Sequence, residues 1–324
     1  MRAMVRREYG GPEVLRPAEV DRPTVGAGEL LVEVDAAGLD RGVWHLMAGS
    51  PYLVRLAFGV RAPKNPVLGL DVAGRVVAVG EGVTRFAVGD EVFGIAQGSF
   101  AEYAVALERK LVHRPAALPV EQAAVATISG ITALQALTDA GRVEAGQHVL
   151  VIGASGGVGT FAVQLAHALG ARVTGVASAR KAAAVLALGA DRVIAYDQEP
   201  VLDGVTRYDL IIDIAGNRPV RELRRALTRT GTLVIVGGEE GGAWTGGNGR
   251  QLRALLLSPF VSQRLTAVFS GERLEAIQRL AAHLESGDVV PAVGGRYRLD
   301  ELPRAVEDLA AGRLVGKAVV LVRP

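Results

Sequence analysis

A glycine-rich turn at residues 154–159 is the part of this chain whose residue types and spacing best suit chemistry. The turn reads Ala154, Ser155, Gly156, Gly157, Val158, Gly159, and it lies between an apolar run at 149–152 and a helical pattern at 160–169. In such a strand–turn–helix, small residues let the backbone approach a ligand, and free N–H groups at the helix start point at phosphate oxygens. The turn therefore predicts a binding site for the pyrophosphate of a dinucleotide.

The residues about 20 positions further on indicate which dinucleotide binds. An NAD site places a carboxylate there, on the ribose 2′-hydroxyl, whereas this chain has Ser178, Arg180 and Lys181. A hydroxyl and two cations can hydrogen-bond a dianionic phosphate, and such charge-assisted bonds are about twice as strong as neutral ones. We therefore expect a 2′-phosphate and hence NADPH, although a solvated position in the first helical turn explains Arg180 equally well.

An alternation of strands and helices must position these residues. Apolar runs predict strands, with helical patterns between most of them; the strands are at 149–152, 172–177, 192–195, 208–213 and 232–236, and the helices at 158–169, 181–188 and 220–227. This order predicts a doubly wound parallel sheet of the α/β class, covered by helices on both faces.

Ligands bind such sheets at the carboxyl ends of the strands. Gly216 and Gly237 follow two of the predicted strands there. Small residues at both points would permit close approach of the ribose and the nicotinamide, and ordinary turn glycines are the alternative interpretation.

The segments on either side of this alternation have a different character. Residues 1–119 hold short alternating runs separated by glycine turns, which are typical of a small, partly open barrel. We expect a catalytic and substrate domain at 1–119, a nucleotide-binding domain at 120–270, and a tail at 271–324 that returns to the first domain. The remaining predicted elements are a strand at 265–269, helices at 121–137, 273–284 and 299–311, and a final strand at 317–322.

Composition narrows the class of protein. The 324 residues are 49% hydrophobic and 22% charged, and the 36 basic and 34 acidic residues are interspersed, which favours a globular enzyme over a partner of nucleic acid or membrane. No apolar run approaches the roughly 18 residues of a membrane span, and the N-terminus lacks a signal-peptide core, so we expect a cytoplasmic protein. The absence of cysteine excludes disulfides, thiolate nucleophiles and cysteine-ligated zinc.

Several short motifs, taken in order, resemble those of the medium-chain dehydrogenase/reductases. They are the segments 36–40, 69–74, 86–94, 101–103, 131–137, 188–191 and 316–317, together with the glycine turn. The most similar branch is the zinc-free quinone oxidoreductase, or zeta-crystallin-like, group. The resemblance implies a GroES-like barrel domain packed on a Rossmann domain with a cleft between them, and a homodimer joined through the 265–269 strand.

The same resemblance implies further cofactor contacts. Lys181 matches the lysine that binds the 2′-phosphate in this branch, and Tyr196 matches its adenosine-side tyrosine. Phe269 lies in the segment whose backbone meets the carboxamide. Thr132 and Lys317, which belong to matched motifs, are expected to contact the cofactor as well.

The metal ligands of the family's zinc branch are replaced. The corresponding positions hold Asp40, Leu70 and an alanine-rich stretch near Ala124. Because Leu70 cannot ligate a metal and no cysteine exists, we expect no metal site.

Catalytic residues are less clearly marked. By resemblance, Asp40 lies near the nicotinamide ribose, and Tyr52 lies near the proton-donating tyrosine of related enoyl reductases, one residue out of that pattern. A cleft wall or a packed core position is an equally good interpretation of each.

The sequence therefore predicts a zinc-independent, NADPH-dependent oxidoreductase that reduces quinones or α,β-unsaturated carbonyls by hydride transfer. Its partner would be a small-molecule electrophile. A carbonyl reductase or alcohol dehydrogenase acting at C=O, and an NADPH-binding protein without turnover, are the alternatives.

Overall fold

The computed structural model describes residues 1–52, 54–238, 248–268 and 271–323. The chain divides into a first unit, Met1–Ser129 with Glu272–Pro324, and a second unit, Gly130–Gly271. Among the described residues, none of the helices combines the length and the apolar character that crossing a membrane requires.

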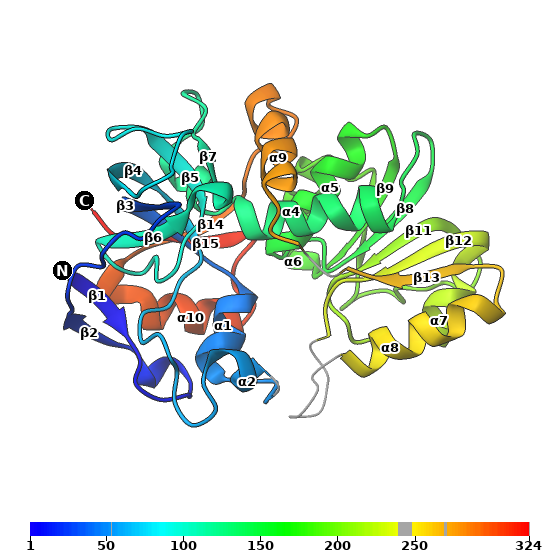
Figure 1. Cartoon of the computed structure of the whole chain (residues 1–324). Coiled ribbons are helices and arrows are strands. Elements are labelled where there is room, and N and C mark those ends of the chain that lie inside the picture. Colours follow the sequence, from blue (N-terminus) through cyan, green and yellow to red (C-terminus); the bar gives the residue numbers. More distant parts are fainter. Residues whose placement is uncertain (53, 239–247, 269–270, 324) are drawn as a thin grey trace. The chain divides into compact units, whose positions relative to one another are not determined.

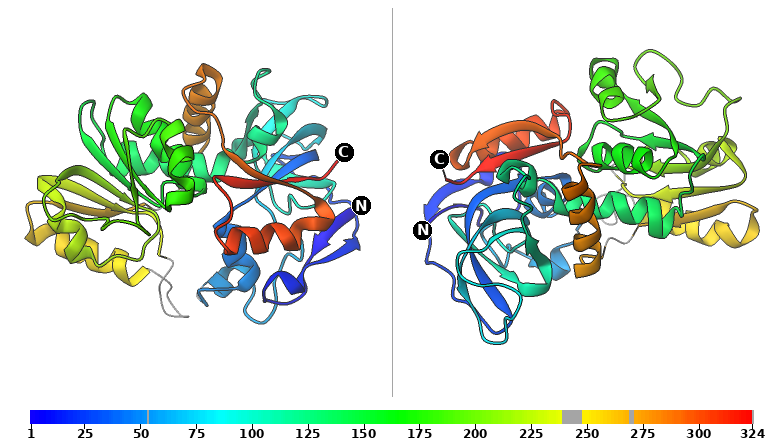
Figure 2. Two further views of the ribbon diagram at one scale, coloured as in Figure 1. Left: turned by 180° about the vertical axis from the view of Figure 1, so that it is seen from behind. Right: turned by 90° about the horizontal axis from the view of Figure 1, so that it is seen from above.

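The first unit is built around a seven-stranded sheet that both ends of the chain supply. Its order is β14-β15-β3-β4-β5-β7, with β6 also paired to β3. The strands are β3 (Glu29–Leu39), β4 (Asp71–Val79), β5 (Glu91–Ile95), β6 (Tyr103–Leu107), β7 (Leu111–His113), β14 (Val293–Arg298) and β15 (Lys317–Leu321). The antiparallel pairing of β15 with β3 joins the C-terminal tail to this sheet, as the red and blue strands of Figure 2 show.

Helices and a two-stranded ribbon, β1 (Arg2–Val5) with β2 (Arg16–Glu19), complete the first unit. The helices are α1 (Arg41–Ala48), α2 (Val54–Phe58), α3 (Val120–Ala124), α9 (Leu274–Ser286) and α10 (Leu302–Ala310). An apolar core that includes Leu39, Val72 and Val320 binds the sheet to α1 and α10.

Residues 120–129 belong to the first unit, whereas the sequence pattern placed the boundary at 119/120. Helix α3 packs on β3 and β4, and Gly38 lies so close to the carbonyl of Ala124 that a Cβ would collide with it. The Asp71 carboxylate accepts a hydrogen bond of 2.9 Å from the Ile128 N–H. These contacts tie the segment to β3 and β4.

The second unit is a six-stranded, wholly parallel sheet of order β10-β9-β8-β11-β12-β13. Its strands are β8 (His148–Ile152), β9 (Arg172–Ala177), β10 (Arg192–Ala195), β11 (Tyr208–Asp213), β12 (Leu227–Ile235) and β13 (Arg264–Ala267). In chain order this is 3-2-1-4-5-6, the doubly wound dinucleotide-binding arrangement, and it reverses between β8 and β11. The predicted α/β fold is confirmed.

Four of the described helices pack on the sheet of the second unit. Helices α5 (Gly157–Ala168) and α6 (Ala179–Ala187) pack on β8, β9 and β10, whereas α7 (Val220–Arg225) packs on β12 and α8 (Asn248–Leu257) on β13. Figure 1 shows the two pairs on opposite faces.

The helix predicted at 121–137 is wrong as a single element. The structure has α3, then α4 (Thr127–Gln135), then a π-helical turn at Ala136–Ala140. The break follows from the hydrogen bond between Asp71 and the Ile128 N–H, which starts a new helix.

Candidate cofactor and active site

The glycine turn lies where the strand order reverses. Strand β8 ends at Ile152, Gly156 is the N-cap of α5, and α5 begins at Gly157 with no acidic residue in its first turn. The first N–H groups of a helix have no intrahelical acceptor. Because no carboxylate of the first turn competes for these donors, the turn is suited to a pyrophosphate.

Gly159 shows why the turn needs its last glycine. A Cβ at this position would collide with the carbonyl oxygen of Gly153, so only glycine lets α5 approach the end of β8 this closely. At Gly156, in contrast, a Cβ would meet only the Gly153 oxygen, at an ordinary 3.5 Å. The space beside Gly156 is therefore open to a ligand.

Gly216 and Gly237 lie against each other. A Cβ on Gly216, whose φ is +71°, would lie 2.5 Å from the Gly237 carbonyl oxygen, and a Cβ on Gly237 would collide with the Ile214 carbonyl. Close packing of the two strand-end loops thus explains both glycines without a ligand. Their predicted cofactor contacts stay predictions.

An ion pair beneath these loops was missed from the sequence. Asp213, fully buried at the end of β11, accepts the Gly216 N–H at 3.1 Å and pairs with Arg250 of α8 at 2.5 Å. An apolar strand that ends on Asp213 indicates a buried carboxylate in the sequence. Its partner, Arg250, lies 37 residues further along the chain and cannot be identified from this pattern.

The predicted phosphate pocket comes together at the end of β9. Ser178 is the N-cap of α6 and its side chain makes no capping hydrogen bond, Arg180 is exposed, and Lys181 is half-buried. Burial, and next the neighbouring Arg180, hold the pKa of Lys181 below its ordinary value. Both causes disfavour the charged form of Lys181, and an anion bound here would favour it.

The neighbouring strand adds Tyr196, 58% exposed, and an acid that sequence reasoning missed. Asp197 accepts a 2.8 Å hydrogen bond from the Ala179 N–H, at the start of α6. Its carboxylate is therefore held beside the cations by a backbone donor.

In the first unit, Lys317 forms a buried ion cluster with Asp40 and Asp71, here called the triad. Lys317 is 1% exposed, and its Nζ contacts Asp71 Oδ2 and lies 3.2 Å from Asp40 Oδ2. The other oxygen of Asp40 accepts the Val43 N–H and caps α1. The predicted cofactor contact of Lys317 stays a prediction, and in this structure its ammonium is buried inside the unit and held by two carboxylates.

The triad carries two carboxylates and one ammonium. Burial raises the pKa of Asp71 to about 6, against the lowering effect of Lys317. For Lys317, burial lowers the pKa, but Asp71 and Asp40 raise it more, so its pKa lies above the ordinary value. The cluster therefore keeps Lys317 charged at neutral pH.

The remaining predicted residues fall in different places. Tyr52 is 42% exposed and lies against the Arg55 guanidinium, 4.7 Å from its ring centre. Thr132 is half-buried in α4. Phe269 lies outside the described residues.

Comparison with known proteins decides the family. Residues 26–116 match the alcohol dehydrogenase GroES-like domain, and residues 188–320 match the family described as zinc-binding dehydrogenase. The quinone oxidoreductase of Lama guanicoe is 31% identical over 100% of this chain and 98% of its own length. This chain belongs to the quinone oxidoreductase branch of the medium-chain dehydrogenase/reductases.

Solved structures of this branch agree over the whole chain. The quinone oxidoreductase from Coxiella burnetii has a TM-score of 0.88 and 28% identity, covering 100% of this chain and 99% of its own. The Escherichia coli quinone oxidoreductase, solved complexed with NADPH, has a TM-score of 0.84 and 25% identity, covering 99% and 100%.

The matched family is described as zinc-binding, but the residues of this chain do not fit a zinc site. Leu70 is apolar, no cysteine is present, and the carboxylates of Asp40 and Asp71 are bound to Lys317. Among the described residues, no group of three histidine, aspartate or glutamate side chains could hold a metal ion.

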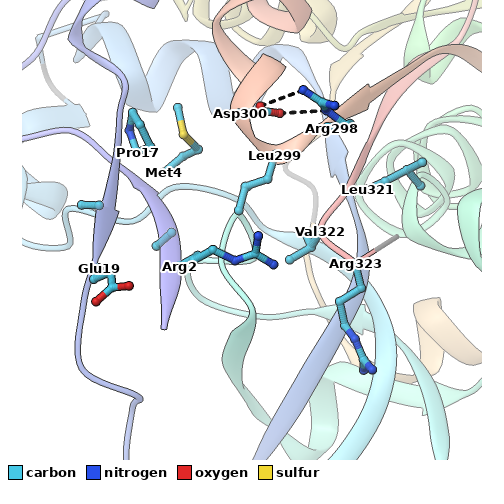
Figure 3. A pocket seen from close by; sticks show the side chains of 12 residues that line it. Arg2, Met4, Pro17, Glu19, Arg298, Leu299, Asp300, Leu321, Val322 and Arg323 are labelled. Carbon is cyan, nitrogen blue, oxygen red and sulfur yellow. Dashed lines mark hydrogen bonds and ion pairs between the residues drawn. The ribbon is translucent and has the colours of Figure 1, made fainter.

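Two cavities in the first unit differ in character. One, of about 810 Å³, lies between the β1–β2 ribbon and the end of β15 (Figure 3), and its arginines pair with carboxylates: Arg2 with Glu102, Arg298 with Asp300, and Arg323 with Glu33. It contains none of the predicted site residues. The other, of about 430 Å³, is lined by Leu70 and apolar neighbours, by the amides of Asn65 and Gln97, and by the charged residues Arg6, Glu29, Lys64, Lys110 and Glu272.

Proposed function

We propose that this chain is an NADPH-dependent oxidoreductase that reduces quinones by hydride transfer. The observation that carries the proposal is the glycine turn at the strand-order reversal, together with Ser178, Arg180 and Lys181, which follow the neighbouring strand β9 where an NAD site would place an acid. Full-length similarity to quinone oxidoreductases, one of them complexed with NADPH, supports the same function.

Bound NADPH would supply the hydride, and the protein's residues would bind and orient the reactants. The open N–H groups at the start of α5 would hold the pyrophosphate, and Lys181 with Ser178 would hold the 2′-phosphate. Asp40 and Tyr52 are the proposed catalytic residues near the nicotinamide ring of NADPH. Further proposed cofactor contacts are Thr132, Tyr196, Gly216, Gly237 and Phe269.

We assign the electrophile to the 430 Å³ cavity beside Leu70. Its walls include Leu46, Phe58, Leu68 and Ile95, which suit a flat apolar ring, while the amides of Asn65 and Gln97 can donate hydrogen bonds to a carbonyl oxygen. An α,β-unsaturated carbonyl has the same combination of features and is proposed as a second substrate class. The cavity suits a substrate with an isolated C=O bond less well, because no group of side chains in the described part of the chain fits a metal ion that would polarise this bond.

NADPH oxidation with a panel of quinones and enones tests the function, with Gly156→Val as the matched control. A valine at Gly156 adopts φ −82° without strain, and its Cβ meets only the Gly153 oxygen, at 3.5 Å, yet its side chain enters the space proposed for the pyrophosphate. We expect the wild type to turn over, and the variant to bind NADPH roughly tenfold or more weakly, about 1.4 kcal/mol, with an unchanged unfolding midpoint. Tight NADPH binding without turnover of any acceptor would favour the binding-protein alternative.

We further propose a homodimer through the edge strand β13 and the adjoining α8. Leu252, Leu256 and Phe260 repeat every four residues and are 59%, 64% and 84% exposed, which leaves an apolar stripe beside a strand that the described sheet pairs on one side only. A cytoplasmic location likewise remains a proposal.

Phe260→Glu is expected to shift the protein from dimer to monomer, because it places a charge in the stripe. Light scattering after size-exclusion chromatography measures the mass directly. Leu186→Glu, at an exposed apolar residue of α6, serves as the control and should leave the mass unchanged. A wild-type monomer, or a dimer that survives Phe260→Glu, would refute this interface.

A further inference from the structure

A small cleft in the second unit lies at the edge of the sheet opposite the glycine turn. It has a volume of about 210 Å³, and Gln147, Asp209 and Arg264 in its wall stand at or next to the first residues of β8, β11 and β13. Because the six strands are parallel, these residues occupy the amino-end edge, whereas the cofactor turn follows the carboxyl end of β8. The cleft is therefore separate from the proposed NADPH site.

Two arginines face this cleft without a carboxylate partner. Neither Arg142 nor Arg264 makes an ion pair or a side-chain hydrogen bond with another residue of the described ranges. The arginines around the 810 Å³ cavity of Figure 3 provide the contrast, since each of them contacts a carboxylate within 2.9 Å. Arg142 is exposed and Arg264 is half-buried.

Both arginines line the same small cleft, so their positive charges repel each other. Burial, and next the charge of Arg142, lower the pKa of Arg264 from its ordinary value. Arg142 is also the described non-glycine residue with a positive φ, +52°, a backbone conformation that such residues adopt at a cost. The fold thus brings two like charges together at a strained position, which an anion between them would stabilise.

Hydroxyl groups complete the wall of the cleft. Between Leu227 and Thr232, strand β12 leaves its ladder with β11, because the register passes from the Tyr208–Leu227 pair to the Leu210–Thr232 pair. This bulge carries Thr228 and Thr230 into the wall of the cleft. The carboxylate in the same wall, Asp209, accepts a 3.0 Å hydrogen bond from the His148 N–H.

We propose that Arg142, Arg264 and the threonines of the β12 bulge form a binding site for a phosphate-type oxyanion. Paired guanidinium forks match the oxygens of phosphate, and threonine hydroxyls donate to the remaining ones. A volume of about 210 Å³ admits free phosphate with water or the phosphate of a small monoester. The site is independent of the proposed reductase activity.

Isothermal titration with inorganic phosphate and, separately, with glycerol 3-phosphate tests the site. Arg264→Gln and Arg142→Asn remove one guanidinium each, and asparagine tolerates the left-handed backbone at 142. We expect each variant to weaken binding about tenfold or more. Arg229→Ala, in the same bulge but outside the cleft wall, should leave it unchanged.

Lys181→Ala separates this site from phosphate binding in the cofactor pocket. Binding that survives Lys181→Ala and is lost in Arg264→Gln supports the proposal, and tighter binding of the monoester than of phosphate would identify the fuller ligand. The proposal is overturned if neither compound binds at millimolar concentration, or if both arginine variants, folded by circular dichroism, bind as the wild type does.

Discussion

Lys317→Met is expected to lower the free energy of unfolding by about 3–5 kcal/mol, the cost of breaking a buried ion pair from one side. The ammonium of Lys317 is 1% exposed and holds two carboxylates, of which Asp71 is fully buried and Asp40 is 7% exposed. Methionine fills a similar volume, so lost packing contributes little. Urea denaturation at pH 7 measures the change.

The pH dependence of this variant distinguishes lost charge from lost packing. The folded pKa of Asp71, about 6, lies above its ordinary value of 3.8, so its contribution to stability is fully present below pH 3.8 and is lost as pH rises through 6. Removing the cation that lowers this pKa raises it further. The loss in free energy of unfolding that Lys317→Met causes, relative to the wild type, should therefore be larger at pH 7 than at pH 4.

A compensating variant provides the control. Adding Asp71→Asn to Lys317→Met removes the charge left unpaired, while an amide can still accept the Ile128 N–H. The double variant should recover part of the lost stability. Two results together would contradict this account: a loss of unfolding free energy that is the same at pH 4 and pH 7, and no recovery when Asp71→Asn is added. They would mean that charge does not hold the triad together.

The sheet of the second unit could be predicted because its determinants are local. Each strand is a short apolar run, and the glycines that follow β8, β11 and β12 are visible in the chain. The helix boundaries within 121–137 could not be predicted, since the break between α3 and α4 depends on Asp71, which lies 57 residues before Ile128. Local helical periodicity does not reveal a distant carboxylate.

The charged residues show the same limit. A motif places Lys317 near a cofactor, but only the antiparallel pairing of β15 with β3 reveals that it lies beside Asp40, 277 residues away. The positions of Gly216 and Gly237 predict close approach of a ligand, whereas the close packing of the strand-end loops already requires small residues at both. Residue types indicate which chemistry is possible. The packing of distant segments decides which hydrogen-bond or ion-pair partner each polar group has.

Lys181→Ala is expected to narrow the preference for NADPH over NADH by about 10–150-fold, the equivalent of one charge-assisted hydrogen bond of about 1.5–3 kcal/mol. Lys181 is half-buried at the end of β9, beside the cap of α6. Only NADPH presents a 2′-phosphate, so the affinity for NADH should hardly change. Fluorescence titration with both cofactors measures the two dissociation constants, and Arg180→Ala, at the more exposed neighbour, should have the smaller effect.

A substitution at Asp197 is expected to change the NADPH preference in the opposite direction. Its carboxylate lies at the start of α6, held by the Ala179 N–H at 2.8 Å, and it opposes a phosphate bound beside it. Asp197→Asn keeps a hydrogen-bond acceptor and removes the charge, so it should widen the NADPH preference that Lys181→Ala narrows. Opposite shifts in the two variants would locate the 2′-phosphate between these side chains, because only a charged group there can respond to both. Equal affinities for NADPH and NADH in the wild type would contradict the phosphate pocket altogether.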